Sequence, residues 1–97
     1  MNGLRLDRFL FFARFAKSRI VAQKMVDVGA VRIDGARVTN RHAPVWTGQV
    51  LTLAMNGQFR VIQIEDMPNR RGPISEAQAC YCEIVPVQAI DVPPDRF

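Results

Sequence analysis

The segment RLDRFLFFARFAKSRIVAQKMVDVGAVRIDG, residues 5–35, determines the fold that this 97-residue sequence predicts. Its first part carries apolar residues at the i, i+3, i+4 and i+7 spacing of one buried helical stripe, namely Leu6, Phe9, Leu10 and Ala13. This spacing predicts a helix over residues 6–14. Arg5 and Arg8 then lie on the outer side of that helix.

A second helix is predicted over residues 19–28, between a capping residue and a glycine stop. The hydroxyl of Ser18 can accept a hydrogen bond from a free backbone N–H of the first turn. Gly29 can adopt the left-handed conformation that ends a helix. We expect an apolar inner face and a polar outer face, formed by Val21, Ala22, Met25 and Val28 and by Arg19, Gln23 and Asp27 respectively.

After Gly29 the apolar residues alternate with polar ones, which indicates strands. The predicted elements are a hairpin over residues 30–38 that turns at Asp34-Gly35, and strands over 50–53 and 59–64 that are joined at Asn56-Gly57. Pro44 and Gly48 bracket a predicted loop that contains Trp46.

The C-terminal third is predicted to begin with a loop over residues 67–73. A short helix over 75–82, capped by Ser75, a strand over 83–87 and a frayed end at Pro93-Pro94 follow. The length fits one domain with a thin core. The predicted class is α+β: two N-terminal helices packed on a small antiparallel sheet, with a short C-terminal helix.

The positive charge is concentrated in the first half of the chain. The net charge is +4, and residues 1–41 hold nine lysines and arginines against three aspartates, a balance of +6. Residues 42–97 have a balance of −2, with four arginines against six acidic residues. A polyanion would feel the field of the basic half, although a solvated basic face without any partner remains the alternative.

Three cations cluster around the predicted start of the second helix: Arg14, Lys17 and Arg19. The helix start adds free N–H groups and the positive end of the helix dipole, which together favour a phosphate. Arg37 and Arg41 follow the first hairpin and are expected to reach the same side. Phe11 is expected in the core, whereas Phe12 and Phe15 fit either the core or a base-stacking role.

Catalysis, a bound metal and a cofactor are not expected. Cys80, Cys82 and the single histidine, His42, are too few and too irregularly spaced for zinc, so the cysteines are interpreted as structural. The sequence contains neither a Gly-rich phosphate loop nor a nucleophile elbow. The longest apolar run, residues 9–13, is too short to span a bilayer, and we expect a cytoplasmic protein retained whole.

The first half of the chain resembles S4-type RNA-binding domains. The residues that carry this resemblance are Arg5-Leu6-Asp7, Arg14, Lys17-Ser18-Arg19, Ala22 and the segment Gly29-Ala30-Val31-Arg32-Ile33-Asp34-Gly35. A later segment, Arg70-Arg71-Gly72-Pro73 followed by Glu76-Ala77-Gln78 and Tyr81, resembles bacterial ribosome-associated proteins of the heat-shock protein 15 family.

The resemblance implies an S4-type domain over residues 1–66 and an extension over 67–97 that packs on it. It also implies binding to structured RNA, specifically to ribosomal RNA of the large subunit, in ribosome recycling. The expected contacts are Arg5, Arg14, Lys17, Ser18 and Arg19, followed by Arg8, Gln23, Arg37 and Arg41. Neither a membrane nor DNA is an expected partner.

Two other functions stay open from the sequence. In the first, exposed phenylalanines and the Arg70-Arg71 loop bind a partner protein, and the positive charge serves only solubility. In the second, the chain holds RNA for a separate RNA-modifying enzyme. The first function predicts a partner complex that survives nuclease digestion.

Overall fold

The computed structural model describes residues 3–55 and 57–84. Within them the helices are α1 (Leu6–Phe12), α2 (Arg19–Asp27) and α3 (Ile74–Gln78). The strands are β1 (Leu4–Arg5), β2 (Val31–Ile33), β3 (Ala36–Val38), β4 (Pro44–Val45), β5 (Val50–Met55), β6 (Gln58–Ile64) and β7 (Tyr81–Ile84). The chain is therefore an α+β protein, as the sequence predicts.

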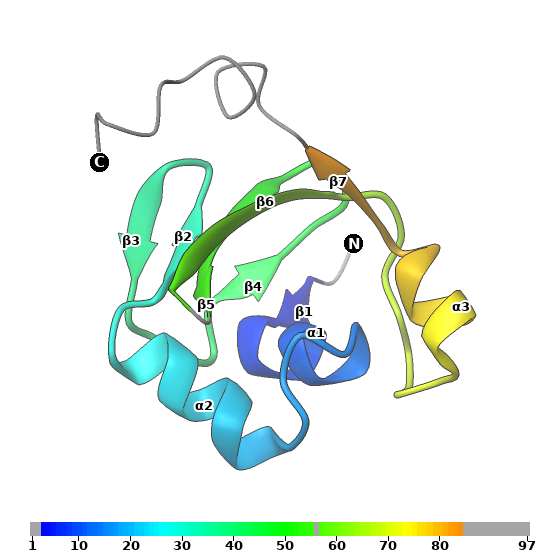
Figure 1. The fold of residues 1–97 in the computed structure, drawn as a ribbon, viewed down its shortest axis with the longest axis horizontal. Helices are drawn as coiled ribbons and strands as arrows, with labels where there is room; N and C mark the ends of the chain where they lie inside the picture. Colours follow the sequence, from blue (N-terminus) through cyan, green and yellow to red (C-terminus); the bar gives the residue numbers. More distant parts are fainter. Residues whose placement is uncertain (1–2, 56, 85–97) are drawn as a thin grey trace.

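Five antiparallel strands form a sheet in the order β3-β2-β5-β6-β7, and β1 pairs with β4 in a separate ribbon. The sheet curves over α1 and α2, which lie on one of its faces, while α3 lies beside β7 (Figure 1). The register pairs Val31 with Leu53 and Leu51 with Ile62, and all four side chains are fully buried. These alternate residues form the sheet's side of the core.

Helix α1 supplies the other side of the core through the predicted stripe. Leu6, Phe9 and Leu10 are fully buried, and Ala13 is nearly so. Burying each of the three large side chains stabilises the fold by about 1.5–3 kcal/mol. The helix position and its buried face are therefore confirmed.

Helix α2 begins and ends as predicted, but one inward residue was assigned wrongly. The Ser18 hydroxyl accepts a hydrogen bond from the Val21 N–H at 3.2 Å, and Gly29 has φ +77°. Val26 is fully buried, whereas Val28 is 69% exposed. Val28 is the C-terminal cap of α2, so the chain already turns away from the helical period at this residue.

The strands predicted between residues 30 and 64 are confirmed, and the first hairpin has the predicted turn. Asp34 and Gly35 have φ values of +50° and +86°, the two left-handed residues of a type I′ turn. Asp34 also fixes the hairpin to β5, because its carboxylate accepts a hydrogen bond from the Val50 N–H at 2.9 Å. The short pairing of β4 with β1 replaces part of the loop predicted around Trp46.

The C-terminal prediction needs correction. Helix α3 ends at Gln78, and Pro73 rather than Ser75 occupies its capping position. Tyr81 and Cys82 lie in β7, which pairs with β6, instead of in a helix. The sequence rule failed because pairing to an open sheet edge depends on a distant segment. Residues 85–87 of the predicted strand and Pro93-Pro94 lie outside the described residues.

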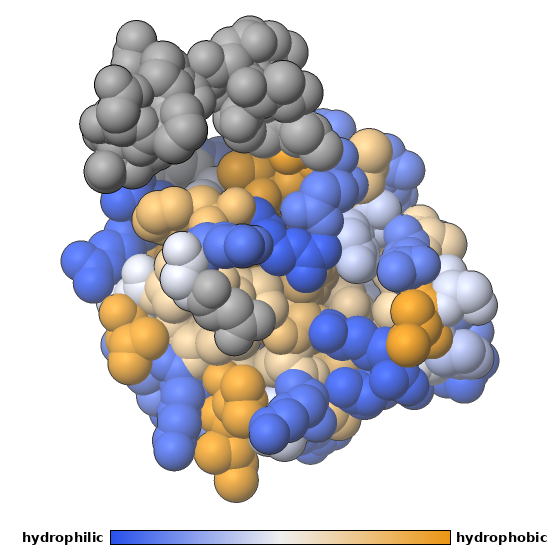
Figure 2. Space-filling view, viewed as in Figure 1, coloured by the Kyte–Doolittle hydropathy of each residue, from blue (hydrophilic) through white to orange (hydrophobic). Residues whose placement is uncertain are grey.

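Several large apolar side chains are exposed on the surface of the described residues. No helix in this part of the chain is long and apolar enough to cross a bilayer. The large exposed side chains include Ile20, Val28, Phe59 and Ile74. Figure 2 shows apolar surface in the middle of one face, with hydrophilic side chains around it.

Candidate nucleic-acid interface

A buried carboxylate organises the contact between α1 and α2. Asp7 is only 4% exposed and accepts hydrogen bonds from Arg5 Nη2 at 2.8 Å, from Arg5 Nε at 3.1 Å and from the Arg8 N–H at 2.9 Å. Gln23 on α2 donates to the same carboxylate at 3.5 Å. Burial alone would raise the pKa of Asp7, but the hydrogen bonds and charge of Arg5 outweigh it, and the pKa is lowered.

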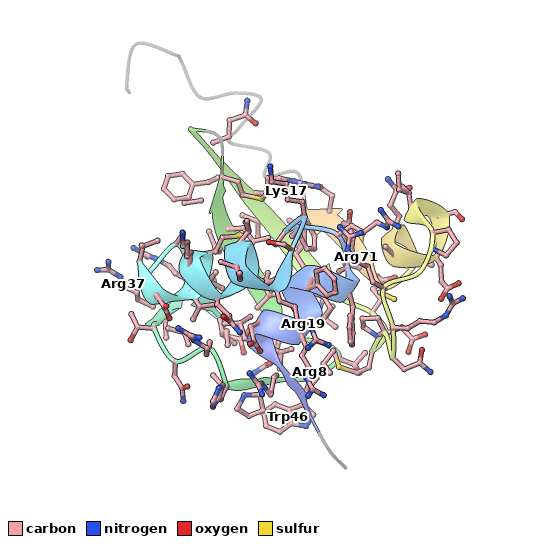
Figure 3. The ribbon with its side chains drawn as sticks, turned by 90° about the horizontal axis from the view of Figure 1, so that it is seen from below. Arg8, Lys17, Arg19, Arg37, Trp46 and Arg71 are labelled. Atoms are coloured by element: carbon pink, nitrogen blue, oxygen red, sulfur yellow. The ribbon has the colours of Figure 1, made fainter. Side chains whose placement is uncertain are left out.

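This arrangement assigns different tasks to the predicted contact residues. Arg5 and Gln23 hold Asp7 through hydrogen bonds to its carboxylate. Arg8 and Arg19 are exposed beside them. The five residues Arg5, Asp7, Arg8, Arg19 and Gln23 together line one shallow depression. Figure 3 shows Arg8 and Arg19 on the helical face of the molecule.

Arg14 terminates α1, as expected, although the helix is two residues shorter than the predicted range 6–14. Its φ is +66°, and α1 has already ended at Phe12. The Arg14 N–H bonds to the Phe11 carbonyl and the Phe15 N–H to the Leu10 carbonyl, which is the hydrogen-bond pattern of a Schellman stop. Its side chain donates to the Gly72 carbonyl at 2.7 Å. Arg14 therefore connects the end of α1 to the C-terminal segment.

The three cations predicted around the start of α2 lie along two adjoining hollows. Arg14 and Lys17 line one cavity, and Arg19 lines the shallow depression between α1 and α2. Phe11 joins the two, because the guanidiniums of Arg19 and Arg71 stack on its ring at 5.9 and 4.8 Å from the centroid. The three cations therefore lie on two hollows that the Arg19–Phe11–Arg71 stack connects.

Arg71 was not among the residues expected to contact RNA, and the sequence placed it only in a loop that could bind a partner protein. It is half-buried and donates a hydrogen bond to the Ala16 carbonyl at 3.2 Å. The only sequence signal for Arg71 was its place in the segment Arg70-Arg71-Gly72-Pro73. No sequence spacing could indicate its contact with Ala16, because the two residues are 55 positions apart. Its neighbour Arg70 pairs with Glu76 at 2.8 Å.

Arg37 and Arg41 lie at the opposite end of α2. Arg37 donates to the Val28 carbonyl at 3.4 Å and packs against Gly29, while Arg41 pairs with Asp27 at 2.6 Å. Figure 3 shows Arg37 far from Lys17 and Arg71. The structure therefore brings Arg8 and Arg19 together in the shallow depression, places Lys17 on the adjoining cavity, and places Arg37 and Arg41 near the end of α2.

The structure shows how far the predicted aromatic and cysteine side chains are buried, and it leaves Phe12 between its two predicted roles. Phe15 is 6% exposed and belongs to the core, and Phe11 and Phe12 are half-buried. Cys80 is buried and fits the structural interpretation, whereas Cys82 is exposed and does not. Burial raises the pKa of the Cys80 thiol, and nearby Asp66 and Glu76 add to the effect. Within residues 3–55 and 57–84, no three metal-ligating side chains come together.

Comparison with known proteins places this arrangement in a family. A family model described as the S4 domain matches residues 4–51. Heat shock protein 15 of Escherichia coli (strain K12) is 34% identical over 80 residues, which are 82% of this chain and 59% of that protein. The heat shock protein 15 homolog of Haemophilus influenzae is 32% identical over 80 residues, with coverages of 82% and 60%.

A solved structure extends the similarity to three dimensions. The trimeric structure of Vibrio cholerae heat shock protein 15 has a TM-score of 0.81 and 34% identity, and the comparison covers 92% of this chain and 87% of the other. The chain spans about three fifths of the length of the curated relatives. The S4 match includes α1, α2 and the first hairpin, the structural similarity covers 92% of the chain, and on this evidence the chain belongs to the heat shock protein 15 family of S4-domain proteins.

Proposed function

We propose that the chain binds structured RNA, without catalysing a reaction, through a helix-start surface formed by Arg8, Lys17 and Arg19. The observation that carries the proposal is the exposure of these three cations around the capped start of α2. Among the described residues, the ion pairs engage Arg5, Arg41, Arg60 and Arg70 but none of these three. Their charge is thus available to phosphates.

The supporting residues have a different role in this proposal. Ser18 fixes the start of α2, where backbone N–H groups and the helix dipole favour a phosphate. Arg5 and Gln23 hold Asp7 and thereby fix α1 against α2. Gln23 would reach a sugar or base edge only by leaving this contact. Arg14 serves the fold through Gly72, and Arg37 and Arg41 would reach only a long RNA helix.

The RNA in this proposal is ribosomal RNA of the large subunit, and the role is ribosome-associated, as in recycling under heat stress. The family membership supports this assignment, together with a net charge of +4 that is concentrated in the first 41 residues. Structured RNA suits the surface because rigid exposed cations recognise backbone shape rather than sequence. A cytoplasmic location follows from this proposal.

The test is RNA binding measured as a function of salt, using purified large subunits, small subunits and transfer RNA. If the three cations neutralise about three phosphates, log K falls against log salt with a slope of roughly −2 to −2.7. We expect the highest affinity for large subunits. Arg8→Gln, Lys17→Gln and Arg19→Gln should each weaken binding and flatten the slope by about one unit.

The matched control is Arg32→Gln, which removes the same charge from an exposed residue of β2. It should change affinity much less than Arg19→Gln. Equal effects of the two variants would reduce the interaction to net charge and contradict the helix-start surface. A slope near zero would contradict RNA binding altogether.

A protein-binding adaptor has less support from the side-chain contacts. Three of the side chains expected to serve it are engaged within the fold, since Phe15 is buried, Arg70 pairs with Glu76 and Arg71 bonds to Ala16, whereas Phe59 is exposed. An adaptor predicts that sedimentation with ribosomal particles survives nuclease digestion, whereas RNA binding predicts its loss. An accessory of an RNA-modifying enzyme would use the same helix-start surface.

A further inference from the structure

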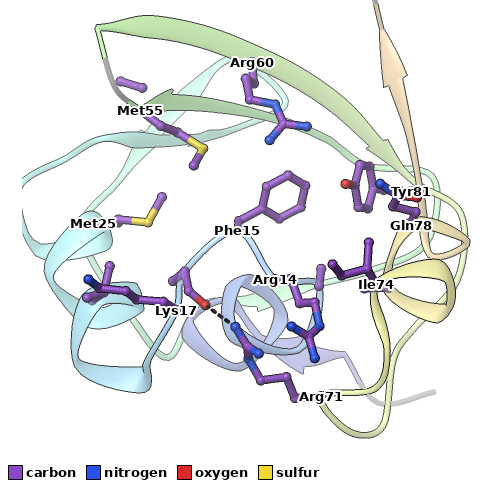
Figure 4. A pocket seen from close by; sticks show the side chains of 15 residues that line it. Arg14, Phe15, Lys17, Met25, Met55, Arg60, Arg71, Ile74, Gln78 and Tyr81 are labelled. Atoms are coloured by element: carbon purple, nitrogen blue, oxygen red, sulfur yellow. Dashed lines mark hydrogen bonds between the residues drawn. The ribbon is translucent and has the colours of Figure 1, made fainter.

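A cavity of about 770 Å³ opens between residues 13–17, the facing ends of β5 and β6, and α3 (Figure 4). Its floor is aromatic, with the Phe15 and Tyr81 ring centroids 4.6 Å apart. Met25 and Met55 line the side opposite Tyr81 (Figure 4). This volume lies within the range of pockets that hold small organic ligands.

The charge of the lining has one sign. Arg14, Lys17, Arg60 and Arg71 line the cavity, and no aspartate or glutamate is among its lining residues. Glu83 pairs with Arg60 from outside the lining, so three cations remain without a carboxylate partner in the described residues. The buried Arg71 Nε has no hydrogen-bond partner within the same residues. The cavity is therefore complementary to an anion.

The cavity is continuous with the helix-start surface. Arg71 lines the cavity and stacks on Phe11, and Arg19 of the helix-start surface stacks on the same ring. Lys17 belongs to both regions. A nucleic-acid strand held by the helix-start surface would therefore reach the cavity with a nearby nucleotide.

We propose that this cavity receives one unpaired nucleotide of the bound RNA. The base lies against the half-buried Tyr81 ring, beside the Arg60 guanidinium that covers the Phe15 ring at 5.1 Å from its centroid, and its phosphate meets Arg14, Lys17 and Arg71. Aromatic rings stack bases of any sequence, whereas a bare anion or an acidic peptide makes no use of them. The inference rests on the proposed function and adds a preference: unpaired nucleotides next to a duplex.

The experiment compares two hairpin RNAs that differ in one nucleotide. One has a fully paired stem, and the other carries a single unpaired 2-aminopurine in the same stem. We expect the full chain to bind the bulged hairpin about tenfold more tightly, with a change in 2-aminopurine fluorescence as the base enters the cavity. Tyr81→Leu should remove this preference, and Tyr81→Phe, which keeps the ring, should retain it.

An exposed position supplies a variant that does not depend on the core. Gln78 is exposed and lines the cavity, so Gln78→Glu adds an anion to it at nearly constant shape. This variant should lower the bulged-to-paired affinity ratio toward one. The control Gln63→Glu makes the same change at an exposed residue of β6 that does not line the cavity, and should leave the ratio unchanged.

The outcomes separate this inference from the proposed function. Equal affinity for the two hairpins would overturn the nucleotide site while leaving RNA binding intact. Absence of binding to either hairpin and to ribosomal RNA would overturn both. A third outcome is that the protein shows no preference for the bulged hairpin and that a hexaglutamate peptide abolishes the 2-aminopurine signal. This outcome would assign the cavity to acidic peptides and overturn the nucleotide site.

Discussion

Arg14 donates a hydrogen bond from its guanidinium Nε to the Gly72 carbonyl at 2.7 Å, across 58 positions of sequence. The same residue ends α1 with a left-handed backbone, a conformation that usually favours glycine. The side-chain contact offers a reason for an arginine at this position: it ties the C-terminal segment to the end of the first helix. Arg71, which follows in that segment, reaches back to Ala16.

This relationship predicts that a glycine at position 14 gives a more stable protein than an alanine, the reverse of the usual order within a helix. Arg14→Ala loses the hydrogen bond, about 0.5–1.5 kcal/mol, and keeps the left-handed strain of a residue with a Cβ. Arg14→Gly loses the same bond but relieves that strain, so it should be more stable than Arg14→Ala by about 1 kcal/mol. Urea unfolding of both variants measures the difference, and a more stable alanine variant would contradict the account.

Asp7 predicts a specific acid sensitivity. Its pKa in the folded protein is below its ordinary value of 3.8, so the unfolded chain binds a proton before the folded one does as the pH falls. The stability from Asp7 is complete above pH 3.8 and is lost as the pH falls through the folded pKa. The loss is measured as the urea midpoint of unfolding at pH values from about 2.5 to about 7, a range that includes the titration of carboxylates.

The control for this prediction is Asp7→Asn, which cannot titrate. It should be less stable by about 1–3 kcal/mol at neutral pH, because Arg5 loses its charged partner. Below pH 3.8 the stability gap to the unsubstituted chain should narrow. A constant gap at all pH values would mean that Asp7 titrates alike in both states.

Ser18 allows stability and RNA binding to be separated. Ser18→Ala removes the cap of α2 and should cost about 1 kcal/mol. Ser18→Asp keeps a capping oxygen and adds a charge that suits the helix dipole, so its stability should match or exceed that of the original chain. The same carboxylate would repel a phosphate, and RNA affinity should fall. Retained affinity in a folded Ser18→Asp variant would argue against phosphate binding at this helix start.

Two adjacent arginines provide a matched pair. Arg71→Gln removes the hydrogen bond to Ala16 and the stacking on Phe11, and should destabilise the fold by about 1–2 kcal/mol. Arg70→Gln removes an exposed ion pair with Glu76 and should cost less than about 0.5 kcal/mol. Thermal unfolding of the two variants measures this contrast, and equal losses would show that Arg71 contributes no more than its charge.

The sequence alone was sufficient where a signal acts within one turn or one hairpin. The buried stripe of α1, the Ser18 cap, the Gly29 stop and the Asp34-Gly35 turn depend on residues only a few positions apart. Such spacing reports directly on the period of a helix or the twist of a hairpin. The same signals misplaced Val28, since the helix period does not continue past a C-terminal cap.

The tertiary structure decided the contacts between distant segments. Pairing of β7 with β6, the Arg14–Gly72 bond and the Arg19–Phe11–Arg71 stack join residues far apart along the chain. No periodicity encodes such contacts, because they form only when the core brings an open sheet edge and a helix end into reach. Composition could therefore indicate a basic chain, but only packing determined which cations are tied to the fold and which remain exposed.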